Sequence, residues 1–233
     1  NCGKYAVYPV QCDGVLIEGC VVSDVWDAGV YAGQCKNVEI RDCVVYRNTI
    51  GIEAENSDNV VIRDNTAFNN SMGILVVLLP NLPSKSADTA LVVNNRVLDN
   101  NYQNNAPEGN FAAMVQPGQG IVIAGADRTE ITGNEIAGHH SVGVLVASIT
   151  DSIQDGQIMG EMKAPIKIDI EPHTDHVFVH GNRYANNGGG PLARQFSSLG
   201  FTRGFDLIWS GKGTGNQWDE PGATSFPPTL PGP

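Results

Sequence analysis

The feature that most limits what this chain can fold into is a phrase of about twenty residues that recurs along it. The segment GIEAENSDNVVIRDNTAFNN, residues 51–70, matches GVYAGQCKNVEIRDCVVYRN at 29–48 and AVYPVQCDGVLIEGCVVSD at 6–24. In each copy, apolar Val and Ile alternate with polar residues, and Gly, Asn and Asp bound these stretches, which is typical of short β-strands and turns. A period of roughly 20 to 25 residues built from strands indicates a solenoid whose units stack and share one core.

Each repeat accommodates three short strands and three turns, which makes it one coil of a parallel β-helix. We therefore predict an all-β, single-stranded solenoid of about seven coils of 22–23 residues with three loop insertions. The β-helix domain is expected to span residues 1–210, with what precedes Asn1 left open, and residues 211–233 to form a Pro/Gly-rich tail.

The alternation also assigns the two faces of each strand, because successive side chains of a strand point to opposite sides. On the first strand of each coil, the expected core positions are Val30, Ala32, Ile52, Ala54, Ile74, Val76, Ile121, Ile123, Val144 and Val146. On the second strand they are Val15, Ile17, Val38, Ile40, Val60, Ile62, Val177 and Val179.

The corner after the second strand carries a recurrent asparagine. Aligned copies place six residues there: Cys20, Cys43, Asn65, Asn95, Asn134 and Asn182. Neighbouring coils of a sheet lie about 4.8 Å apart, so equivalent amides can hydrogen-bond along the stack. We interpret these asparagines as architecture rather than as a binding site.

Composition disfavours two classes of function. The formal net charge of −11 argues against a nucleic-acid partner, which needs a basic footprint. No stretch of about 18 apolar residues is present, so no membrane span is expected. The chain starts in mid-coil at Asn1 rather than at Met, which is typical of a mature product or an excised piece.

Five cysteines raise the question of disulfides. Cys12 and Cys35 occupy one corner of consecutive coils, Cys20 and Cys43 another, and Cys2 is left over. The coil spacing falls within the roughly 4.4–6.8 Å between Cα atoms that a disulfide tolerates. Stacked thiols also pack well as small apolar groups, and we prefer this interpretation.

Three insertions interrupt the repeat, and the loops of a solenoid are where function collects. They are centred on PNLPSKSA, YQNNAPEGNFAAMVQPGQ and SITDSIQDGQIMGEMKAPIKIDIEPH. The first and third leave the coil at the same corner, so they are expected to project from one side and to frame a cleft. Lys85, Lys163 and Lys167 lie on these two insertions and are candidate substrate-binding residues for an acidic polymer.

The outward positions of the first strand form a second candidate region. From coil to coil they are Tyr8, Tyr31, Glu53, Leu75, Val122 and Leu145, and Glu55 follows Glu53 on the same face. Tyr8, Tyr31, Glu53 and Glu55 are candidate substrate-binding residues. The apolar end of the row is expected to be covered by the insertions, since an exposed apolar patch of that size marks a cover or a partner. A calcium groove along the whole face is thus disfavoured; calcium remains the candidate cofactor, with no metal ligands assigned.

The densest group of titratable residues is KIDIEPHTDHVFVH, at the end of the third insertion. Here Glu171, His173 and Asp175 are the candidate catalytic residues, because a base near carboxyl groups suits removal of a sugar C–H proton. EPH with a nearby Asp resembles the Asp-Pro-His-Asp box of mannuronan C5-epimerases, although Glu replaces the first Asp and one residue separates His from the last. His139 and His140 are expected in a corner turn as surface histidines.

A wider resemblance is carried by YAVYPVQC, DAGVYAGQ, GIEAENSDN, GILVVLLPNLPSK, NAPEGN, VQPGQGIVI and EPHTDHVFVHGNRYANNGGGP. These phrases resemble the right-handed parallel β-helix repeat proteins of bacteria over most of residues 5–192. The resemblance implies a right-handed, pectate-lyase-like superhelix and a secreted or periplasmic protein. It implies no settled reaction, and members look like neighbours of c-type cytochromes.

Two functions remain open. One is an exported protein that binds or processes an acidic polysaccharide by lyase or C5-epimerase chemistry; fold analogy and the His173 group favour it. The other is a non-catalytic scaffold or partner protein, associated with a c-type cytochrome redox system, which the apolar outer row favours. A strongly acidic protein repels an acidic polymer unless calcium or a basic patch intervenes. Candidate partners are therefore a polysaccharide and a protein.

Overall fold

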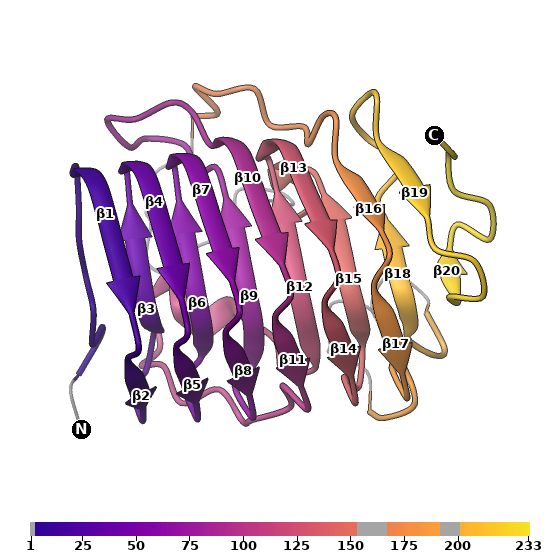
Figure 1. Cartoon of the computed structure of the whole chain (residues 1–233), viewed down its shortest axis with the longest axis horizontal. Helices are drawn as coiled ribbons and strands as arrows, with labels where there is room; N and C mark the ends of the chain where they lie inside the picture. The colour runs from indigo at the N-terminus through magenta and orange to yellow at the C-terminus, as the bar shows by residue number, and fades with distance from the viewer. Residues whose placement is uncertain (1–2, 153–166, 192–200) are drawn as a thin grey trace.

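The computed structural model describes residues 3–152, 167–191 and 201–233, and these residues form a parallel β-helix (Figure 1). Each coil runs through three strands, one in each of three sheets, and every pairing between neighbouring strands is parallel. The predicted fold class and the division of each coil into three strands are confirmed.

Successive coils place their equivalent strands side by side in each sheet. Sheet A contains β3 (Ala28–Gly33), β6 (Ile50–Glu55), β9 (Met72–Val77), β12 (Gln119–Ala124), β15 (Val142–Ala147), β18 (Phe205–Trp209) and β20 (Ser225–Phe226). Sheet B contains β1 (Asp13–Glu18), β4 (Lys36–Arg41), β7 (Asp58–Arg63), β10 (Asp88–Val93), β13 (Asp127–Thr132), β16 (Phe178–His180) and β19 (Gln217–Asp219). Sheet C contains β2 (Val21–Ser23), β5 (Val44–Tyr46), β8 (Thr66–Phe68), β11 (Arg96–Leu98), β14 (Glu135–Ala137) and β17 (Arg183–Ala185).

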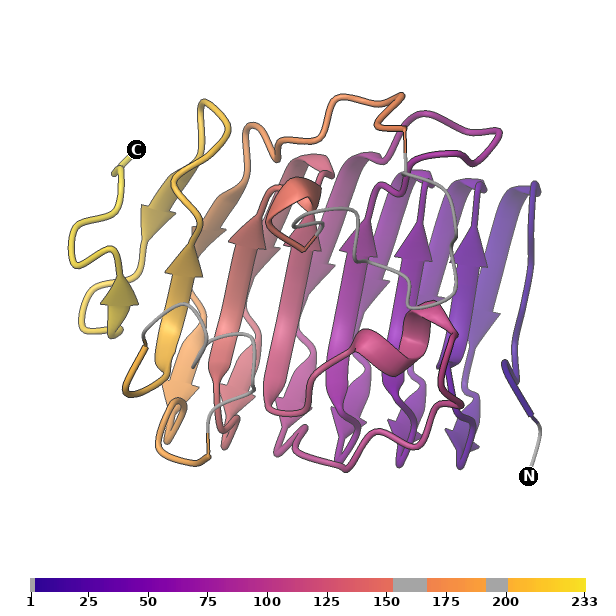
Figure 2. The same ribbon diagram turned by 180° about the vertical axis from the view of Figure 1, so that it is seen from behind.

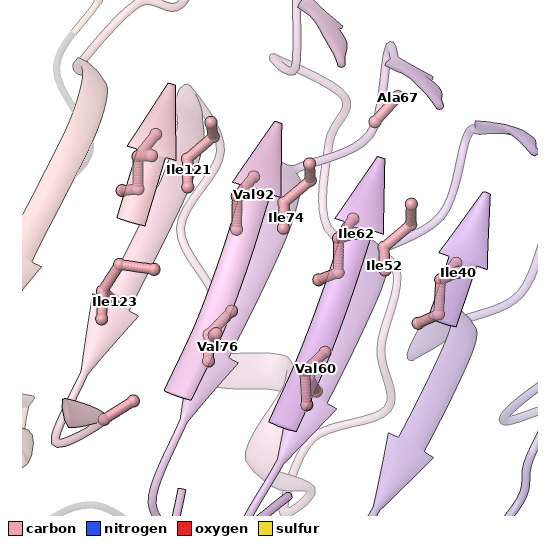
Figure 3. Packing of buried hydrophobic residues seen from close by; sticks show 14 of the residues in the cluster. Ile40, Ile52, Val60, Ile62, Ala67, Ile74, Val76, Val92, Ile121 and Ile123 are labelled. Carbon is pink, nitrogen blue, oxygen red and sulfur yellow. The ribbon is translucent and has the colours of Figure 1, made fainter. Parts of the chain in front are cut away.

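The core is a set of stacked β-branched side chains inside the coils (Figure 3). Ile52, Ile74 and Ile121 pair in register across sheet A and are all fully buried. Ile40 and Ile62 do the same across sheet B. The predicted core positions of the first strand are all buried, and on the second strand only Val15 is partly exposed.

The corners explain the Gly, Asn and Asp that bound the strands. After the sheet B strands β1, β4, β7, β10, β13 and β16, one residue adopts a positive φ, which glycine, asparagine and aspartate accept most readily. These residues are Gly19, Asp42, Asp64, Asn94, Gly133 and Gly181. The chain can thus turn sharply at the same place in every coil.

The predicted asparagine ladder is present at the next position of this corner. Asn65 Nδ2 donates to Asn95 Oδ1 at 3.0 Å, Asn95 to Asn134 at 3.0 Å, and Asn134 to Asn182 at 2.9 Å. The last amide donates to Glu220 Oε1 at 2.6 Å. Since these groups are largely buried, each hydrogen bond satisfies polar atoms that would otherwise be costly to remove from water.

A second buried ladder, not predicted from the sequence, runs along the corner after sheet C. Its members are Asn48, Asn70, Asn100, His139 and Asn187, and it ends at Asp206. His139 is fully buried here, so the expectation of a surface histidine was wrong. Asn100 Nδ2 lies 3.1 Å from His139 Nε2, and His139 Nδ1 lies 2.9 Å from Asn187 Oδ1. Because an amide nitrogen can only donate, the histidine proton sits on Nδ1.

The insertions lie where the sequence placed them. They are residues 78–87 after β9, residues 99–118 after β11 with the 3₁₀ turn η1 (Phe111–Met114), and the segment after β15 that begins with α1 (Ile149–Ser152). Figure 2 shows the 99–118 connection crossing the outer side of sheet A. Val115, Ile149 and Ile170 from the last two insertions pack there against the row that includes Leu75 and Val122, as expected.

The C-terminal segment 211–233, expected as a tail, adds β19 to sheet B and β20 to sheet A. Trp209 and Trp218 pack against each other there, with ring centroids 5.2 Å apart. Cys12, Cys20, Cys35 and Cys43 are free thiols. Cys35 and Cys43 are buried, in keeping with the preferred interpretation, whereas Cys20 is partly exposed and Cys12 is exposed; Cys2 lies outside the described residues. Among the residues that the structure describes, no helix is long and apolar enough to cross a lipid bilayer.

Candidate functional site

The outward row on sheet A places the predicted tyrosines and glutamates together. Tyr31 pairs with Glu53 in the next coil, and Tyr8 lies on the segment before β1, which bridges to β3 through Val7 and Val30. We call Lys4, Tyr5, Tyr8, Asp27, Tyr31, Glu53 and Glu55 the tyrosine–carboxyl cluster.

Three aromatic rings form one side of this cluster. The ring centroids of Tyr5 and Tyr8 are 4.4 Å apart with nearly parallel planes, and Tyr31 lies 4.8 Å from both. Tyr31 is buried, whereas Tyr8 is 53% exposed, so this group of three rings presents one open aromatic ring, that of Tyr8. A flat ring with a polar tip is a surface that suits a partly apolar, partly hydroxylated ligand.

Tyr31 is held in place by its neighbours. Its hydroxyl donates to Glu55 Oε1 at 2.5 Å. The ring lies along β3 over Gly33, where a Cβ atom would come within 2.3 Å of the Tyr31 hydroxyl. Glycine at this position therefore makes room for the ring.

Three carboxyl groups form the other side of the cluster. Burial raises the pKa of Glu53 well above its ordinary range, and the nearby Glu55 and Asp27 carboxyls raise it further. Burial also raises the pKa of Asp27, against the pull of Lys4, and that of Glu55, against the hydrogen bond from Tyr31. Acids with raised pKa values favour the protonated form and can serve as proton donors.

The predicted catalytic histidine lies at the far end of sheet A, beyond β15. His173 Nδ1 is 3.1 Å from Ser148 Oγ, and the Ser148 hydroxyl donates to the Pro172 carbonyl at 2.8 Å. A carbonyl can only accept, so when the serine proton is directed there, or to Thr150 Oγ1 at 2.7 Å, His173 Nδ1 donates to Ser148 Oγ. The second ring nitrogen, Nε2, has no partner among the described residues, and in this tautomer it carries the free lone pair.

The carboxyl groups expected beside His173 have other contacts. Glu171 is exposed and its Oε1 accepts the backbone N–H of His173 at 3.1 Å. Asp175 accepts the backbone N–H of Thr214 at 2.5 Å and lies in the turn against the following coil. Glu171 thus contacts the backbone of His173 rather than its imidazole, and Asp175 is used to hold the turn between two coils.

The two insertions that follow the first strand of a coil project from the same edge of the solenoid, as expected (Figures 1 and 2), and they contact each other there; the cleft between them stays a prediction. Lys85 Nζ forms an ion pair with Asp169 Oδ2 at 2.5 Å, and Asn81 N–H donates to the same carboxylate at 2.9 Å. These contacts lower the pKa of Asp169. Lys167 is exposed, and Lys163 lies outside the described residues. Lys85 is therefore neutralised within the protein.

A metal centre has little support in this arrangement. Within residues 3–152, 167–191 and 201–233, no group of three His, Cys, Asp or Glu side chains is placed to hold a metal ion. Calcium needs several oxygen ligands together, so the described carboxyl groups do not make a calcium site without rearrangement.

Residues 1–79 match the family model described as a right-handed β-helix region. The fold of the chain is that of a right-handed parallel β-helix. Among solved structures, this β-helix is similar to a double mutant of the periplasmic alginate epimerase AlgG, with 14% identity, a TM-score of 0.54 and coverage of 95% of this chain and 45% of that one. A C387A mutant of DFA-IIIase from Arthrobacter chlorophenolicus A6 has 12% identity, a TM-score of 0.47 and coverage of 93% and 53%. The β-helix spans about half the length of these proteins. No curated protein sequence matches it.

Several residues of the site were missed by sequence reasoning. Lys4, Tyr5 and Asp27 join the tyrosine–carboxyl cluster, and Ser148 orients His173. Asp27 directly precedes the first strand of a coil, and Tyr5 lies three residues before Tyr8. The repeat alignment could therefore have placed both residues near the outward row of the first strand. The Ser148 contact spans an insertion and has no signal in the repeat.

Proposed function

We propose that this β-helix protein binds or processes a polysaccharide on the outer side of sheet A. The observation that carries the proposal is the stack of Tyr5, Tyr8 and Tyr31 beside buried carboxyl groups, with the Tyr8 ring open to solvent. Binding sites for ligands that have both apolar faces and hydrogen-bonding groups commonly combine aromatic rings with a few polar side chains. We also propose a secreted or periplasmic location, where such polymers are found.

His173 gives the proposal a chemical step. Its Nδ1–H is anchored on Ser148, so Nε2 is oriented to accept a proton. For an acidic polysaccharide, lyase or C5-epimerase chemistry would assign proton abstraction to His173 and neutralisation of the sugar carboxylate to Lys167. Lys85 is already paired with Asp169, which weakens this acidic-polymer version.

The scaffold hypothesis was favoured by an apolar outer row that was expected to need a cover or a partner. The apolar row from Leu75 to Leu145 is packed against Val115, Ile149 and Ile170 of the chain itself. No partner protein is needed to cover it.

A binding panel tests the proposal. Alginate, pectin and a neutral glucan are offered to the wild type and to Tyr8→Ala, with Tyr46→Ala on sheet C as the matched control. Tyr46 stacks on Phe68 away from sheet A, at 5.2 Å between ring centroids, so its loss should leave binding unchanged. Loss of a stacking ring should weaken binding about tenfold in Tyr8→Ala. Equal binding by both variants would contradict the proposed site.

Turnover is measured separately on the polymers that bind. Unsaturated product is followed by ultraviolet absorbance and exchange of the C5 proton by NMR, in His173→Ala and in His180→Ala as the control. His180 lies on sheet B and contacts Glu130 at 2.9 Å, remote in sequence and sheet from Ser148. Activity that survives in His173→Ala would exclude the proposed base.

A further inference from the structure

The tyrosine–carboxyl cluster already holds one ammonium group, that of Lys4. Lys4 Nζ lies 4.8 Å from the ring centroid of Tyr5 and 5.8 Å from that of Trp26. It is also 3.6 Å from Asp27 Oδ2. Aromatic faces and carboxylates are the two kinds of protein group that hold organic ammonium ions.

We propose that this cluster is a binding site for the protonated amine of an amino sugar within a polysaccharide that carries free amino groups. The inference rests on the proposed polysaccharide function and replaces the acidic polymer by a cationic one. Lys4 then acts as an internal occupant that the ligand amine joins or displaces.

Glu53 supplies the observation that points to a ligand. This side chain is only 2% exposed, and within the described part of the chain it forms no hydrogen bond or ion pair. A buried carboxyl group without a partner is costly. Asp27 is paired with Lys4, and Glu55 accepts the hydrogen bond of the Tyr31 hydroxyl. A second cation would therefore pair with Glu53.

The composition of the cluster favours an organic ammonium ion over a metal ion. Hard metal ions such as Ca²⁺ take six to eight oxygen ligands, whereas about half of the groups here are aromatic rings. An amino sugar can contact the carboxyl groups and the aromatic rings at once. Its ammonium group would point toward the carboxyl groups, and its sugar ring would lie on an aromatic face. Tyr8, the exposed member of the stack, is where the sugar ring would lie.

The charge of the whole protein agrees with this assignment. At a formal net charge of −11, the protein attracts a cationic polymer and repels an anionic one. The cluster itself brings three carboxyl groups, those of Asp27, Glu53 and Glu55, close to a single lysine; burial favours their protonated form, and a bound ammonium ion would favour the charged form.

The experiment compares two oligosaccharides that differ at their amino groups, which are charged in one and acetylated in the other. A chito-oligosaccharide with free amines and its fully N-acetylated form are titrated calorimetrically at about pH 6 and about 0.15 M salt. The free-amine form should bind about tenfold more tightly than the acetylated form.

Variants locate the effect. Glu55→Gln keeps an acceptor for the Tyr31 hydroxyl but removes the charge, so it should abolish the difference between the two oligosaccharides. Glu135→Gln is the matched control, because Glu135 is paired with Arg96 on sheet C. Lys4→Met should tighten amino-sugar binding severalfold, since it removes the internal occupant. Far-ultraviolet circular dichroism confirms that each variant is folded, and Glu53→Gln provides a second test if Glu55→Gln is not.

Each outcome decides the matter. Equal binding of the two oligosaccharides, a difference that survives Glu55→Gln, or weaker binding by Lys4→Met would overturn the inference. Binding of alginate or neutral glucan without binding of the amino oligosaccharide would overturn it and leave the proposed function standing. A lysine peptide that binds as tightly would reassign the cluster to a basic peptide. Failure of every polysaccharide to bind would instead remove the proposed function.

Discussion

The histidine within the second ladder makes the stability of the protein depend on pH. Burial lowers the pKa of His139 to about 4, against the hydrogen bond that its Nδ1–H donates to Asn187, while its ordinary value is about 6.5. In the unfolded chain His139 therefore becomes protonated below about pH 6.5, whereas in the folded chain it stays neutral down to about pH 4. The stabilising contribution is present above pH 6.5 and is lost as the pH falls through this window.

The magnitude follows from the size of the shift. A difference of about 2.5 pKa units corresponds to roughly 3 kcal/mol of unfolding free energy, at about 1.4 kcal/mol per unit. Protonation would also place a donor on His139 Nε2, which faces the Asn100 amide nitrogen 3.1 Å away. Two donors cannot form a hydrogen bond, so the ladder would break at this coil.

Two substitutions at His139 separate the stability that comes from hydrogen bonding in the ladder from the pH dependence that comes from protonation of the imidazole. His139→Asn restores the residue found elsewhere in the ladder, so it should cost about 1 kcal/mol or less at pH 7 and should flatten the pH dependence between about 7 and 4.5. His139→Ala leaves Asn100 and Asn187 without a partner and opens a cavity, which should cost about 2–5 kcal/mol.

The assay is urea unfolding at pH 7, 6 and 5, followed by circular dichroism and by tryptophan fluorescence so that the cooperativity of the transition is tested. A wild-type pH slope in His139→Asn would show that another group is responsible. Equal stability of His139→Asn and His139→Ala at pH 7 would refute the hydrogen-bonding role.

Three further predictions concern the coils. Ile62→Ala should cost about 2–5 kcal/mol in urea unfolding because Ile62 is fully buried, whereas Arg63→Ala, which removes solvent-screened ion pairs, should have a much smaller effect; similar costs would mean that the strand faces are misassigned. Gly33→Ala should displace the Tyr31 ring and cost about 1–3 kcal/mol, while Gly189→Ala, whose added methyl group meets no neighbour, should be nearly neutral; a neutral Gly33→Ala would refute the position of the ring. After denaturation without reductant, a thiol reagent should label Cys12, Cys20, Cys35 and Cys43, each identified by peptide mass spectrometry so that Cys2, the fifth cysteine, is counted separately. Loss of two of these four labels would reveal a bridge between coils.

The repetitive part of the molecule was predictable because few physical rules determine it. Alternation along a strand decides which side chain is buried, and stacking repeats that decision in every coil, so Ile52, Ile74 and Ile121 follow from the alignment alone. The Asn65 to Asn182 ladder follows in the same way. The second ladder escaped because a histidine replaces asparagine in one coil and a long insertion separates Asn100 from the next regular strand.

The candidate site was predictable only where it lies on the repeat. Tyr31, Glu53 and Glu55 project from strands, and their side follows from the register. Partners on insertions do not follow, because the course of a loop depends on contacts between residues far apart in the chain. Lys85 with Asp169 is one such contact, and His173 with Ser148 is another.

The direction of the hydrogen bonds in the two ladders has a consequence for the whole solenoid. Between side chains, every amide donates to the next coil and accepts from the coil before, and His139 follows the same direction. The second hydrogen of each Nδ2 donates to a backbone carbonyl of the coil before. Aligned head to tail, these dipoles add as peptide dipoles do along an α-helix, with the positive end at the C-terminal coils. Both columns end there on carboxyl oxygens, those of Glu220 and Asp206. Asp206 in turn accepts the backbone N–H and the hydroxyl of Thr224, so a further coil stacked on these carboxyl groups would have to offer donors, not acceptors, at both positions.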